Sequence, residues 1–440
     1  MPDTPMNLRL ARQIHGLSPQ AMPPELFAQA HESLTDTLLV AAVGRQQAGN
    51  QALRGAVSAS SGSARVWFEP HRQMGLQEAT FINSLHASSV GFDGYFGKVQ
   101  AARVCLPAAW ASAEHAGRSG LDLLHAYIVG CEVTIGLARC RRGKESGWSE
   151  TTVYGAVGAA VSTGVLLGLS PVQLAHAIGL AMAQAAGTRQ AILEPASSHG
   201  LQPAFAARNG AFAAQLAALG ATAPSQALEG PFGLSALYHR GNDRDLFDGL
   251  FTDWAQLGSS LKRYPVAAFA QAAIEALLHL QPQRFKESEV VQIVAYVSPG
   301  IFRYVGAEFS PGDQPQNIGQ RNLRYQLAVT FLRGSFSLAD LAPSAVVDTE
   351  VAAMVRKVHL RVDPTNTGDY APVTLSLLLA DGSEQRYTQQ APPGSPALPL
   401  TLRQKQEKAQ QCAEFGAIDL NGLQRKLASL PEQANLQGFW

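Results

Sequence analysis

Apolar residues recur at three- and four-residue spacing through the first two thirds of the chain, a pattern that predicts amphipathic helices. The clearest case lies in residues 121–140, where the apolar positions are Leu124, Tyr127, Ile128, Cys131 and Ile135. No segment before residue 280 alternates apolar and polar positions over a useful length. We therefore expect this part of the chain to be helical throughout.

Several helix boundaries are marked by residues that favour helix ends. Pro24 opens a helix that continues through Val40. Ser170 is a favourable N-cap and Pro171 suits the first helical position, so a helix is predicted over 172–186. An Ala-rich stretch over 206–219 is followed by Gly220, a residue typical of helix C-termini.

The pattern changes after residue 280. Residues 289–305 and 357–362 are rich in β-branched side chains at alternating positions, which predicts strands. Residues 373–387 contain two such runs around Asp381-Gly382, a strong hairpin signal. Residues 322–333 between these strands have a helical pattern. This part predicts a small α+β domain.

These patterns predict a mainly α protein with three parts. Residues 1–265 form a large helical domain, residues 266–395 an α+β domain, and residues 396–440 two short helices that pack back on the helical domain. The Pro-rich segment 392–396 is the expected linker before helices over 402–415 and 420–430.

Composition narrows the possible partners. The chain has 440 residues, with 34 basic and 34 acidic side chains and a net charge of zero, which argues against binding to nucleic acid or to a membrane surface. Hydrophobic residues make up 46% of the chain, which is enough for a large core, so we expect a folded rather than a disordered protein.

The chain shows no targeting or spanning segment of the usual kind. Residues 1–16 lack the apolar stretch of a signal peptide. The longest apolar run, 153–169, is interrupted by glycine and is short for a bilayer, so we expect a buried core helix. Four cysteines without a CxxC pair fit a reducing compartment, and a cytoplasmic location is predicted.

General catalytic motifs are absent. The sequence has no Walker loop, no GxGxxG after a strand, no HExxH, no GxSxG, and no His/Cys cluster at metal-ligand spacing. Neither a metal nor an organic cofactor is therefore expected, and these motifs indicate no reaction.

Several segments, in order, resemble the MmgE/PrpD family, which includes 2-methylcitrate dehydratase, cis-aconitate decarboxylase and iminodisuccinate epimerase. The resemblance covers nearly the whole chain and depends on the ordered set rather than on one motif. The segments are HESLTDT at 31–37, NSLH at 83–86, FDG at 92–94, LPAAWASAE at 106–114, GWSETTVYG at 147–155, AARNG at 206–210, LEG at 228–230 and KRYP at 262–265.

The resemblance implies a large all-helical domain with a smaller α+β lid, C-terminal helices that return to the helical domain, and a homodimer. It places the active site between the two domains and requires no cofactor. Family reactions share the formation or protonation of carbanion-like density beside a carboxylate, a step that needs a base poised near neutral pH and cationic groups.

At the implied site the sequence departs from the family pattern. Asp93 keeps the loop carboxylate, but its second acidic neighbour is replaced by Gly94, and the family's following His-Pro has no counterpart. Ser149 stands where the family has His, His199 where it has Lys, and Lys262 keeps the lysine at the domain junction. We expect fewer imidazoles and cations than a tricarboxylate enzyme needs, and hence a less anionic, larger substrate than methylcitrate.

The predicted function is a cofactor-independent lyase or isomerase that abstracts a proton beside a carboxylate or carbonyl of a small carboxylate substrate. Asp93 or His199 would be the base, and the latter suits proton transfer because imidazole titrates near neutrality. The predicted catalytic residues are Asp93, His199 and Lys262. The predicted substrate-binding residues are His86, Arg103, Ser149, Thr151, Tyr154 and Tyr264.

Each assignment has a structural alternative. Asp93 suits a turn, Ser149 and Thr151 suit the N-cap of the following helix, and Lys262 suits packing beside Tyr264 with its charge in water. The corresponding alternative for the whole protein is a non-catalytic small-molecule-binding or partner protein on the same scaffold.

Overall fold

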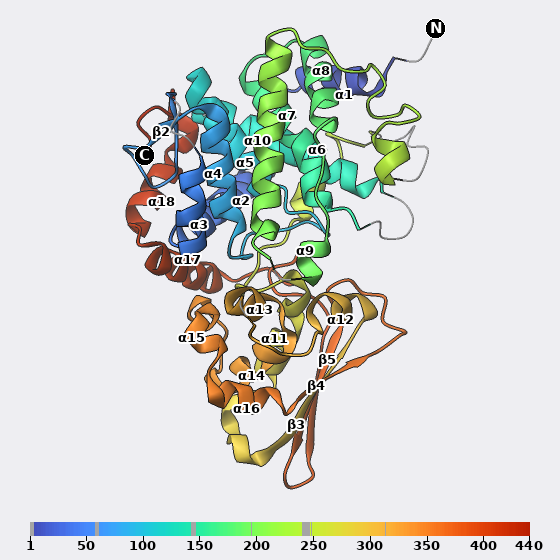
Figure 1. The fold of residues 1–440 in the computed structure, drawn as a ribbon, viewed down its shortest axis with the longest axis vertical. Coiled ribbons are helices and arrows are strands. Elements are labelled where there is room, and N and C mark those ends of the chain that lie inside the picture. The colour runs from blue at the N-terminus through green and yellow to red at the C-terminus, as the bar shows by residue number, and fades with distance from the viewer. Residues whose placement is uncertain are drawn as a thin grey trace.

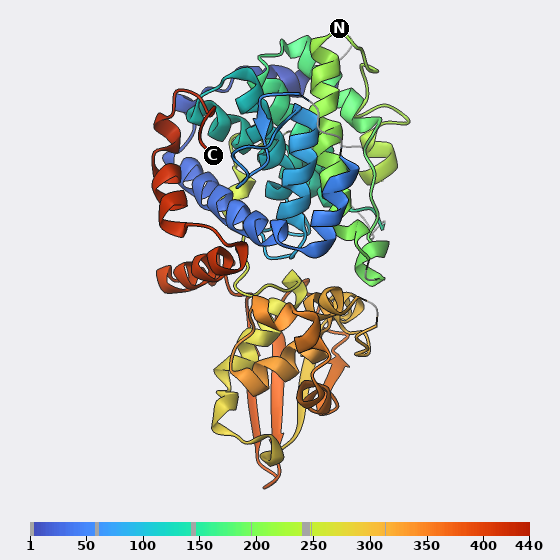
Figure 2. The same ribbon diagram turned by 60° about the vertical axis from the view of Figure 1, so that its left-hand side comes forward.

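The computed structural model describes residues 4–440 except 58–60, 142–146, 195, 240–246, 248 and 313. Figure 1 shows two parts, a helical body and a smaller part that contains the sheet. The last two helices lie along the side of the body, as the turned view in Figure 2 also shows. The mainly α fold class predicted from the sequence is confirmed; the predicted domain boundaries stay a prediction.

The helical body is organised around α7 (Glu150–Leu166), which is buried at nearly every position. It contacts four neighbouring helices, and so confirms the core helix predicted from the apolar run. These neighbours are α5 (Ala102–Ala116), α6 (Gly120–Arg139), α8 (Pro171–Met182) and α10 (Ser198–Ala218). The remaining helices of the body are α1 (Met6–His15), α2 (Pro24–Arg45), α3 (Ala48–Leu53), α4 (Leu76–Ser88) and α9 (Gln190–Leu193).

Small residues allow the closest helix crossings. A Cβ atom added at Gly158 of α7 would lie 2.5 Å from the carbonyl oxygen of Gly130 on α6, and would also meet Thr134. Gly210 of α10 packs in the same way against the backbone of α7 at Ala156. The high glycine and alanine content therefore brings helix backbones together.

Within the described part of the chain, α6 has the length and apolar character of a membrane span, and 78% of its apolar window is buried inside the protein. Burial of this kind is typical of a core helix. The sequence analysis singled out the region of α7 instead, because residues 153–169 form the longest apolar run of the chain, although glycines interrupt it.

The smaller part contains a four-stranded sheet in the order β4-β3-β5-β6. β3 (Val290–Val297) is parallel to β4 (Val358–Val362) and antiparallel to β5 (Val373–Leu379), which pairs with β6 (Glu384–Gln389). The helices of this part are α11 (Gln271–His279), α12 (Pro299–Val305), α13 (Pro315–Arg321), α14 (Leu323–Arg333), α15 (Pro343–Val346) and α16 (Thr349–Val355). α11 and α14 contact each other and pack against the strands.

Two local predictions have different outcomes. The predicted hairpin is confirmed, with Gly382 at φ +84° in its turn. The strand predicted over 289–305 is wrong beyond Val297, because the Ser298 side chain accepts a hydrogen bond from the Ile301 N–H at 3.1 Å and caps α12. The pair β1 (Ala64–Arg65) and β2 (Gln73–Met74) was not predicted; each strand has only two residues.

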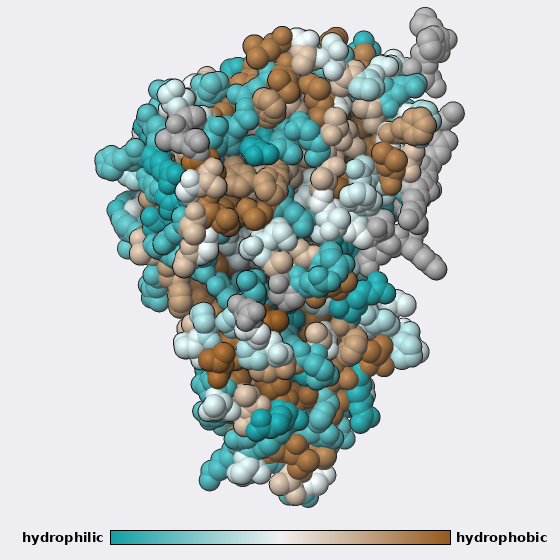
Figure 3. Space-filling view, in the orientation of Figure 1, coloured by the Kyte–Doolittle hydropathy of each residue, from teal (hydrophilic) through white to brown (hydrophobic). Residues whose placement is uncertain are grey.

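The C-terminal segment returns to the body as predicted. α17 (Leu402–Gly416) begins at a capping box on Thr401 and packs against α2. α18 (Leu420–Ala428) follows it and buries Leu423 and Leu427. Figure 3 shows a mixed surface on which apolar side chains gather over α4 and α10. Two aromatic residues of α10, Phe205 and Phe212, are exposed.

Candidate active site

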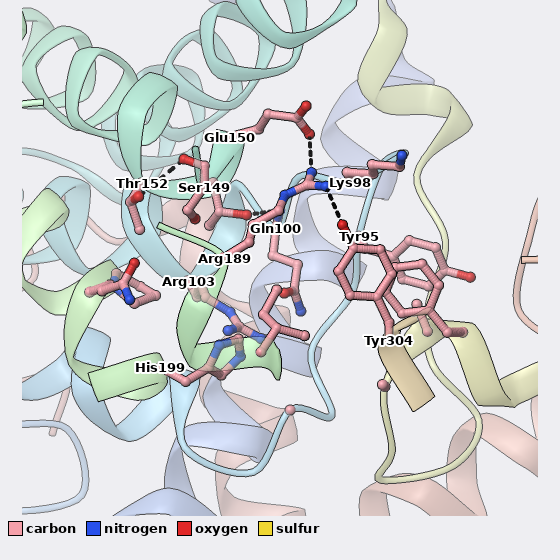
Figure 4. Close-up of a pocket in the computed structure, with 18 of the residues that line it drawn as sticks. Tyr95, Lys98, Gln100, Arg103, Ser149, Glu150, Thr152, Arg189, His199 and Tyr304 are labelled. Atoms are coloured by element: carbon pink, nitrogen blue, oxygen red, sulfur yellow. Dashed lines mark hydrogen bonds and ion pairs between the residues drawn. The ribbon is translucent and has the colours of Figure 1, made fainter. Parts of the chain in front are cut away.

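A cavity of about 110 Å³ lies where the helical body meets the smaller part. The body contributes the loop after α4 and the starts of α5, α7 and α10, and the smaller part contributes α12, α13 and Tyr370. Figure 4 shows side chains from these segments converging on one space. The volume is below the roughly 300–1,000 Å³ of pockets for drug-sized ligands, so the room favours a small molecule.

The described lining is strongly cationic. It contains one carboxylate, Glu150, and five cationic side chains, which are Lys98, Arg103, Arg189, Lys262 and Arg321. The sequence-based expectation of a cation-poor site is therefore wrong. It failed because Arg189 and Arg321 come from segments with no recognisable pattern, and only the fold brings them to the cavity.

Arg103 forms a buried ion pair with Asp93. Its guanidinium donates to both carboxylate oxygens, with Nε 2.7 Å from Oδ2, and Gln100 Nε2 donates to Oδ1 at 3.0 Å. Asp93 is fully buried and does not line the cavity. The prediction of Asp93 as a catalytic base is corrected: its oxygens are occupied, and it orients Arg103 toward the cavity.

A second cationic group is also paired. Glu150 accepts from Arg189 Nη2 at 2.9 Å and from Arg141 Nε at 2.8 Å. Burial raises the pKa of Glu150, and the neighbouring cations oppose that shift. Arg189 Nη1 donates to the Tyr304 hydroxyl at 2.9 Å, which connects the body to α12 (Figure 4). Lys98 pairs with Asp369 at 3.1 Å.

Lys262 and Arg321 differ from the other three cations, since neither forms an ion pair with a carboxylate among the described residues. Lys262 Nζ donates to the Gly91 carbonyl at 2.5 Å, and Arg321 Nη1 donates to the Ala191 carbonyl at 2.7 Å. Burial lowers the pKa of Lys262 to about 7 and that of Arg321 to about 10. The one carboxylate in the described lining, Glu150, is paired with Arg189 and Arg141 instead.

His199 lies in the first turn of α10, partly exposed to the cavity and surrounded by protein. Burial lowers its pKa well below the usual value, and the positive charges of Arg321, Arg103 and Lys262 lower it further. The imidazole is therefore neutral at pH 7. The expectation that it titrates near neutrality is wrong, because its neighbours are cations.

Ser149 and Thr151 also line the cavity at the start of α7. The Ser149 side chain makes no capping hydrogen bond, and the Thr151 hydroxyl accepts from the Gln100 N–H at 3.1 Å. Neither hydroxyl therefore caps α7 through its side chain, and their substrate-binding role stays a prediction.

Three predicted binding residues lie outside the cavity lining. Tyr154 packs against the His239 ring with centroids 5.3 Å apart, and the Tyr264 hydroxyl donates to Glu275 at 2.7 Å. His86 is buried in α4 without a hydrogen-bond partner in the described structure, and burial lowers its pKa to about 3. Each side chain points into the core, so these assignments are corrected.

Sequence reasoning missed most of the contribution of the smaller part. It also missed several residues of the body, and the missed lining residues include Tyr95, Lys98, Gln100, Glu150, Arg189, Tyr304, Gln320, Arg321 and Tyr370. The nearest signal was the helical pattern predicted over residues 322–333, which directly follows Arg321. Burial raises the pKa of Tyr95 to about 12, so this cavity hydroxyl stays protonated.

Family models and known proteins match most of the chain. A family model described as the MmgE/PrpD N-terminal domain matches residues 8–246, and one described as the MmgE/PrpD C-terminal domain matches residues 264–421. A cis-aconitate decarboxylase-like protein of Aspergillus oryzae is 27% identical over 81% of this chain and 79% of its own length.

Two further relatives are named cis-aconitate decarboxylase. The protein of Aspergillus terreus is 28% identical over 62% of this chain and 60% of its own length. The human protein is 24% identical over 85% of this chain and 80% of its own length. These relatives and the family match support a lyase of the dehydratase or decarboxylase type.

Proposed function

The chain belongs to the MmgE/PrpD family, and on that premise we propose that it is a lyase acting on a small di- or tricarboxylate. The observation that carries the proposal is the pair of cations without a carboxylate partner, Lys262 and Arg321, in the described lining of one small cavity. A hydrogen bond to a charged group contributes about 1.5–3 kcal/mol. Two substrate carboxylates would therefore stabilise the complex substantially.

Lys262 is the proposed proton donor. Burial lowers the pKa of its ammonium to about 7, which suits proton transfer at neutral pH. A carboxylate bound beside it raises that pKa again, so the protonated form prevails in the complex. The neutral imidazole of His199 supplies a hydrogen bond to the substrate without adding charge.

Decarboxylation is the proposed reaction, because the relatives quoted above are named cis-aconitate decarboxylases or like proteins. The bond between carbon and the leaving carboxylate breaks, carbon dioxide departs, and the electron pair enters the adjacent unsaturated carboxylate system. Arg321 and Arg103 stabilise the charge that develops there. Lys262 gives its proton to carbon and regains one from water.

The test is turnover of unsaturated and hydroxylated di- and tricarboxylates, cis-aconitate among them, followed by proton NMR in heavy water and by carbon dioxide release. We expect release of carbon dioxide and one solvent deuterium in the product. Lys262→Met should lower kcat at least about 100-fold, the range that positioned proton transfer supplies. Arg321→Gln should mainly raise KM.

The matched control for Arg321→Gln is Arg324→Gln, since Arg324 lies three residues further on and pairs with Glu308 outside the cavity. Its kinetics should equal those of the parent. If the whole panel gives neither product nor deuterium exchange, the lyase proposal fails. Thermal stabilisation by a carboxylate without any product would instead favour the non-catalytic binding protein.

Cofactor independence is part of the proposal. Among the described residues, no group of three His, Cys, Asp or Glu side chains is arranged to hold a metal ion. We expect full activity after exhaustive dialysis against EDTA followed by gel filtration. Activity that is lost on dialysis and restored by a divalent cation would overturn this part. The homodimer and the cytoplasmic location stay predictions; sedimentation as a stable monomer would contradict the former.

A further inference from the structure

We propose that Lys408, on the C-terminal helix α17, is a positioning residue for the cavity loop at residues 91–93. Its Nζ donates to the Phe92 carbonyl at 2.9 Å and lies 4.2 Å from the centroid of the Phe92 ring. The same Nζ lies 2.5 Å from Oδ1 of Asp36 on α2. This inference rests on the proposed function, because the loop supports the proposed proton donor.

Three successive loop residues are each held by a different buried cation. Lys262 contacts the Gly91 carbonyl, Lys408 the Phe92 carbonyl, and Arg103 the Asp93 carboxylate. Lys262 and Arg103 line the cavity, whereas Lys408 does not. A shift of the loop would therefore disturb the contacts of both cavity cations, and Lys408 holds the loop from outside the cavity.

The charges form one buried cluster. Its members are three cations and two carboxylates, which are Lys262, Arg103, Lys408, Asp36 and Asp93. Buried charges are stable only when they are paired and hydrogen-bonded, so removal of one member leaves its partner uncompensated. Without Lys408, the Asp36 carboxylate and the Phe92 carbonyl each lose this donor.

The cluster also acts on the proton donor through its field. The positive charges of Lys408 and Arg103 lower the pKa of Lys262, and the negative charges of Asp36 and Asp93 raise it. The variants below change only Lys408 or Asp36. His199 and Arg321 line the same cavity as Lys262 and are also unchanged in these variants. Removal of Lys408 should raise the pKa of Lys262, and removal of the Asp36 charge should lower it.

The pair can be reached from outside the active site. Lys408 and Asp36 line a separate cavity of about 360 Å³ between α2, α17 and α18, and the exposed Leu402 lies at its rim. A truncated side chain at position 408 would leave space that a small alkylamine can enter from this second cavity. Such an amine would restore the missing ammonium group without restoring the covalent link.

The experiment compares Lys408→Ala, Lys408→Arg and Asp36→Asn with the parent. For Lys408→Ala we expect kcat to fall about 10- to 100-fold, as small misplacements near reacting groups do. The pH limb assigned to Lys262 should move upward, and propylamine should restore part of kcat. Lys408→Arg should retain more activity, and Asp36→Asn should move the limb downward.

The control is Lys405→Ala. Lys405 lies on the same helix and lines the same second cavity, but its ammonium group pairs with Glu32. The kcat and pH limb of this variant should match the parent. Unchanged kcat and pH limb in Lys408→Ala, or equal losses in Lys405→Ala, would overturn the proposal. So would loss of thermal stability without a pH shift or amine rescue.

A direct titration keeps this test separate from the proposed function. The pKa of Lys262 is measured by carbon-13 NMR of lysine-labelled protein, with Lys262→Arg to assign the signal. An upward shift in Lys408→Ala, a downward shift in Asp36→Asn and a smaller shift in Lys408→Arg, which keeps the charge, would support the positioning role even if no substrate turns over. Equal pKa values in all variants would refute it whether or not the parent is active.

Discussion

At the scale of single residues, burial decides which groups in the cavity carry charge. Three cations are neutralised by carboxylates that the fold brings to them, and Lys262 and Arg321 lack such partners in the described structure. Desolvation then moves the Lys262 pKa to about 7 and keeps His199 neutral. The side chain best suited to give a proton is therefore the lysine, not the histidine.

This assignment gives a pH prediction. Below pH 7 Lys262 is protonated and both its charge and its proton are available, and above pH 7 both are lost. We expect kcat/KM to fall about tenfold per pH unit above about 7, the limb of a single required proton. Lys262→Arg should abolish this limb while lowering kcat. A rate that is flat from pH 6 to 9 would contradict the assignment.

A buried carboxyl gives a separate stability prediction. Burial raises the pKa of Glu114 to about 8, although the Arg65 N–H donates to it at 2.7 Å. Since the folded pKa lies above the unfolded value, stability is highest below about pH 4.5 for this group and is lost as pH rises to 8. Glu114→Gln should remove this loss, which is on the order of a few kcal/mol.

The measurement is the difference in urea unfolding free energy between parent and Glu114→Gln at pH 5.5 and pH 8.5. That difference isolates Glu114 from other titrating groups. The variant should gain relative to the parent as pH rises. A constant difference would show that the carboxyl is already ionised in the folded protein at pH 5.5.

At the scale of elements, the crossings of α7 with its neighbours depend on glycine. Gly158→Ala would place a methyl group 2.5 Å from the Gly130 carbonyl and 2.9 Å from Cys105 Sγ. We expect a loss of about 1–3 kcal/mol or more of unfolding free energy from overpacking, despite the better helix propensity of alanine. Because α7 begins at the cavity, activity should fall with stability.

Gly49→Ala in α3 is the matched control, because an added Cβ there meets no atom within 4 Å. Helix propensity alone then acts, and stability should rise by up to about 1 kcal/mol. Thermal and urea unfolding of both variants measure the contrast. Equal effects at the two positions would show that the crossing tolerates a methyl group.

At the scale of the whole molecule, contacts across the two parts hold the cavity together. The Tyr370 hydroxyl donates to the Gly97 carbonyl at 2.7 Å, and Asp369 pairs with Lys98 at 3.1 Å. Tyr370→Phe should raise KM several-fold, since it removes a hydrogen bond of about 1 kcal/mol at the seam. The Tyr387 ring stacks on His279 within the smaller part, so Tyr387→Phe should leave KM unchanged. Equal KM values in both variants would show that the Tyr370 hydroxyl does not contribute to substrate binding.

The sequence predicted the elements well where the signal was local. Ser170-Pro171 starts α8, and Asp381-Gly382 turns the hairpin, because caps and turns depend on a few adjacent residues. Ser149, Thr151, His199, Lys262 and Arg103 do line the cavity, and they lie in segments quoted for the family resemblance or beside them. Their chemical roles stay predictions.

The order of most helices and strands, the mainly α class and the family resemblance follow from the sequence alone. The charge of the site follows from the folded chain only, since Arg189 and Arg321 reach the cavity from different parts of the molecule. The physical reason is that the two kinds of interaction act over different separations along the chain. Periodicity and capping act between neighbours in the chain, whereas desolvation and Coulomb interactions depend on distances in space that only the folded chain defines.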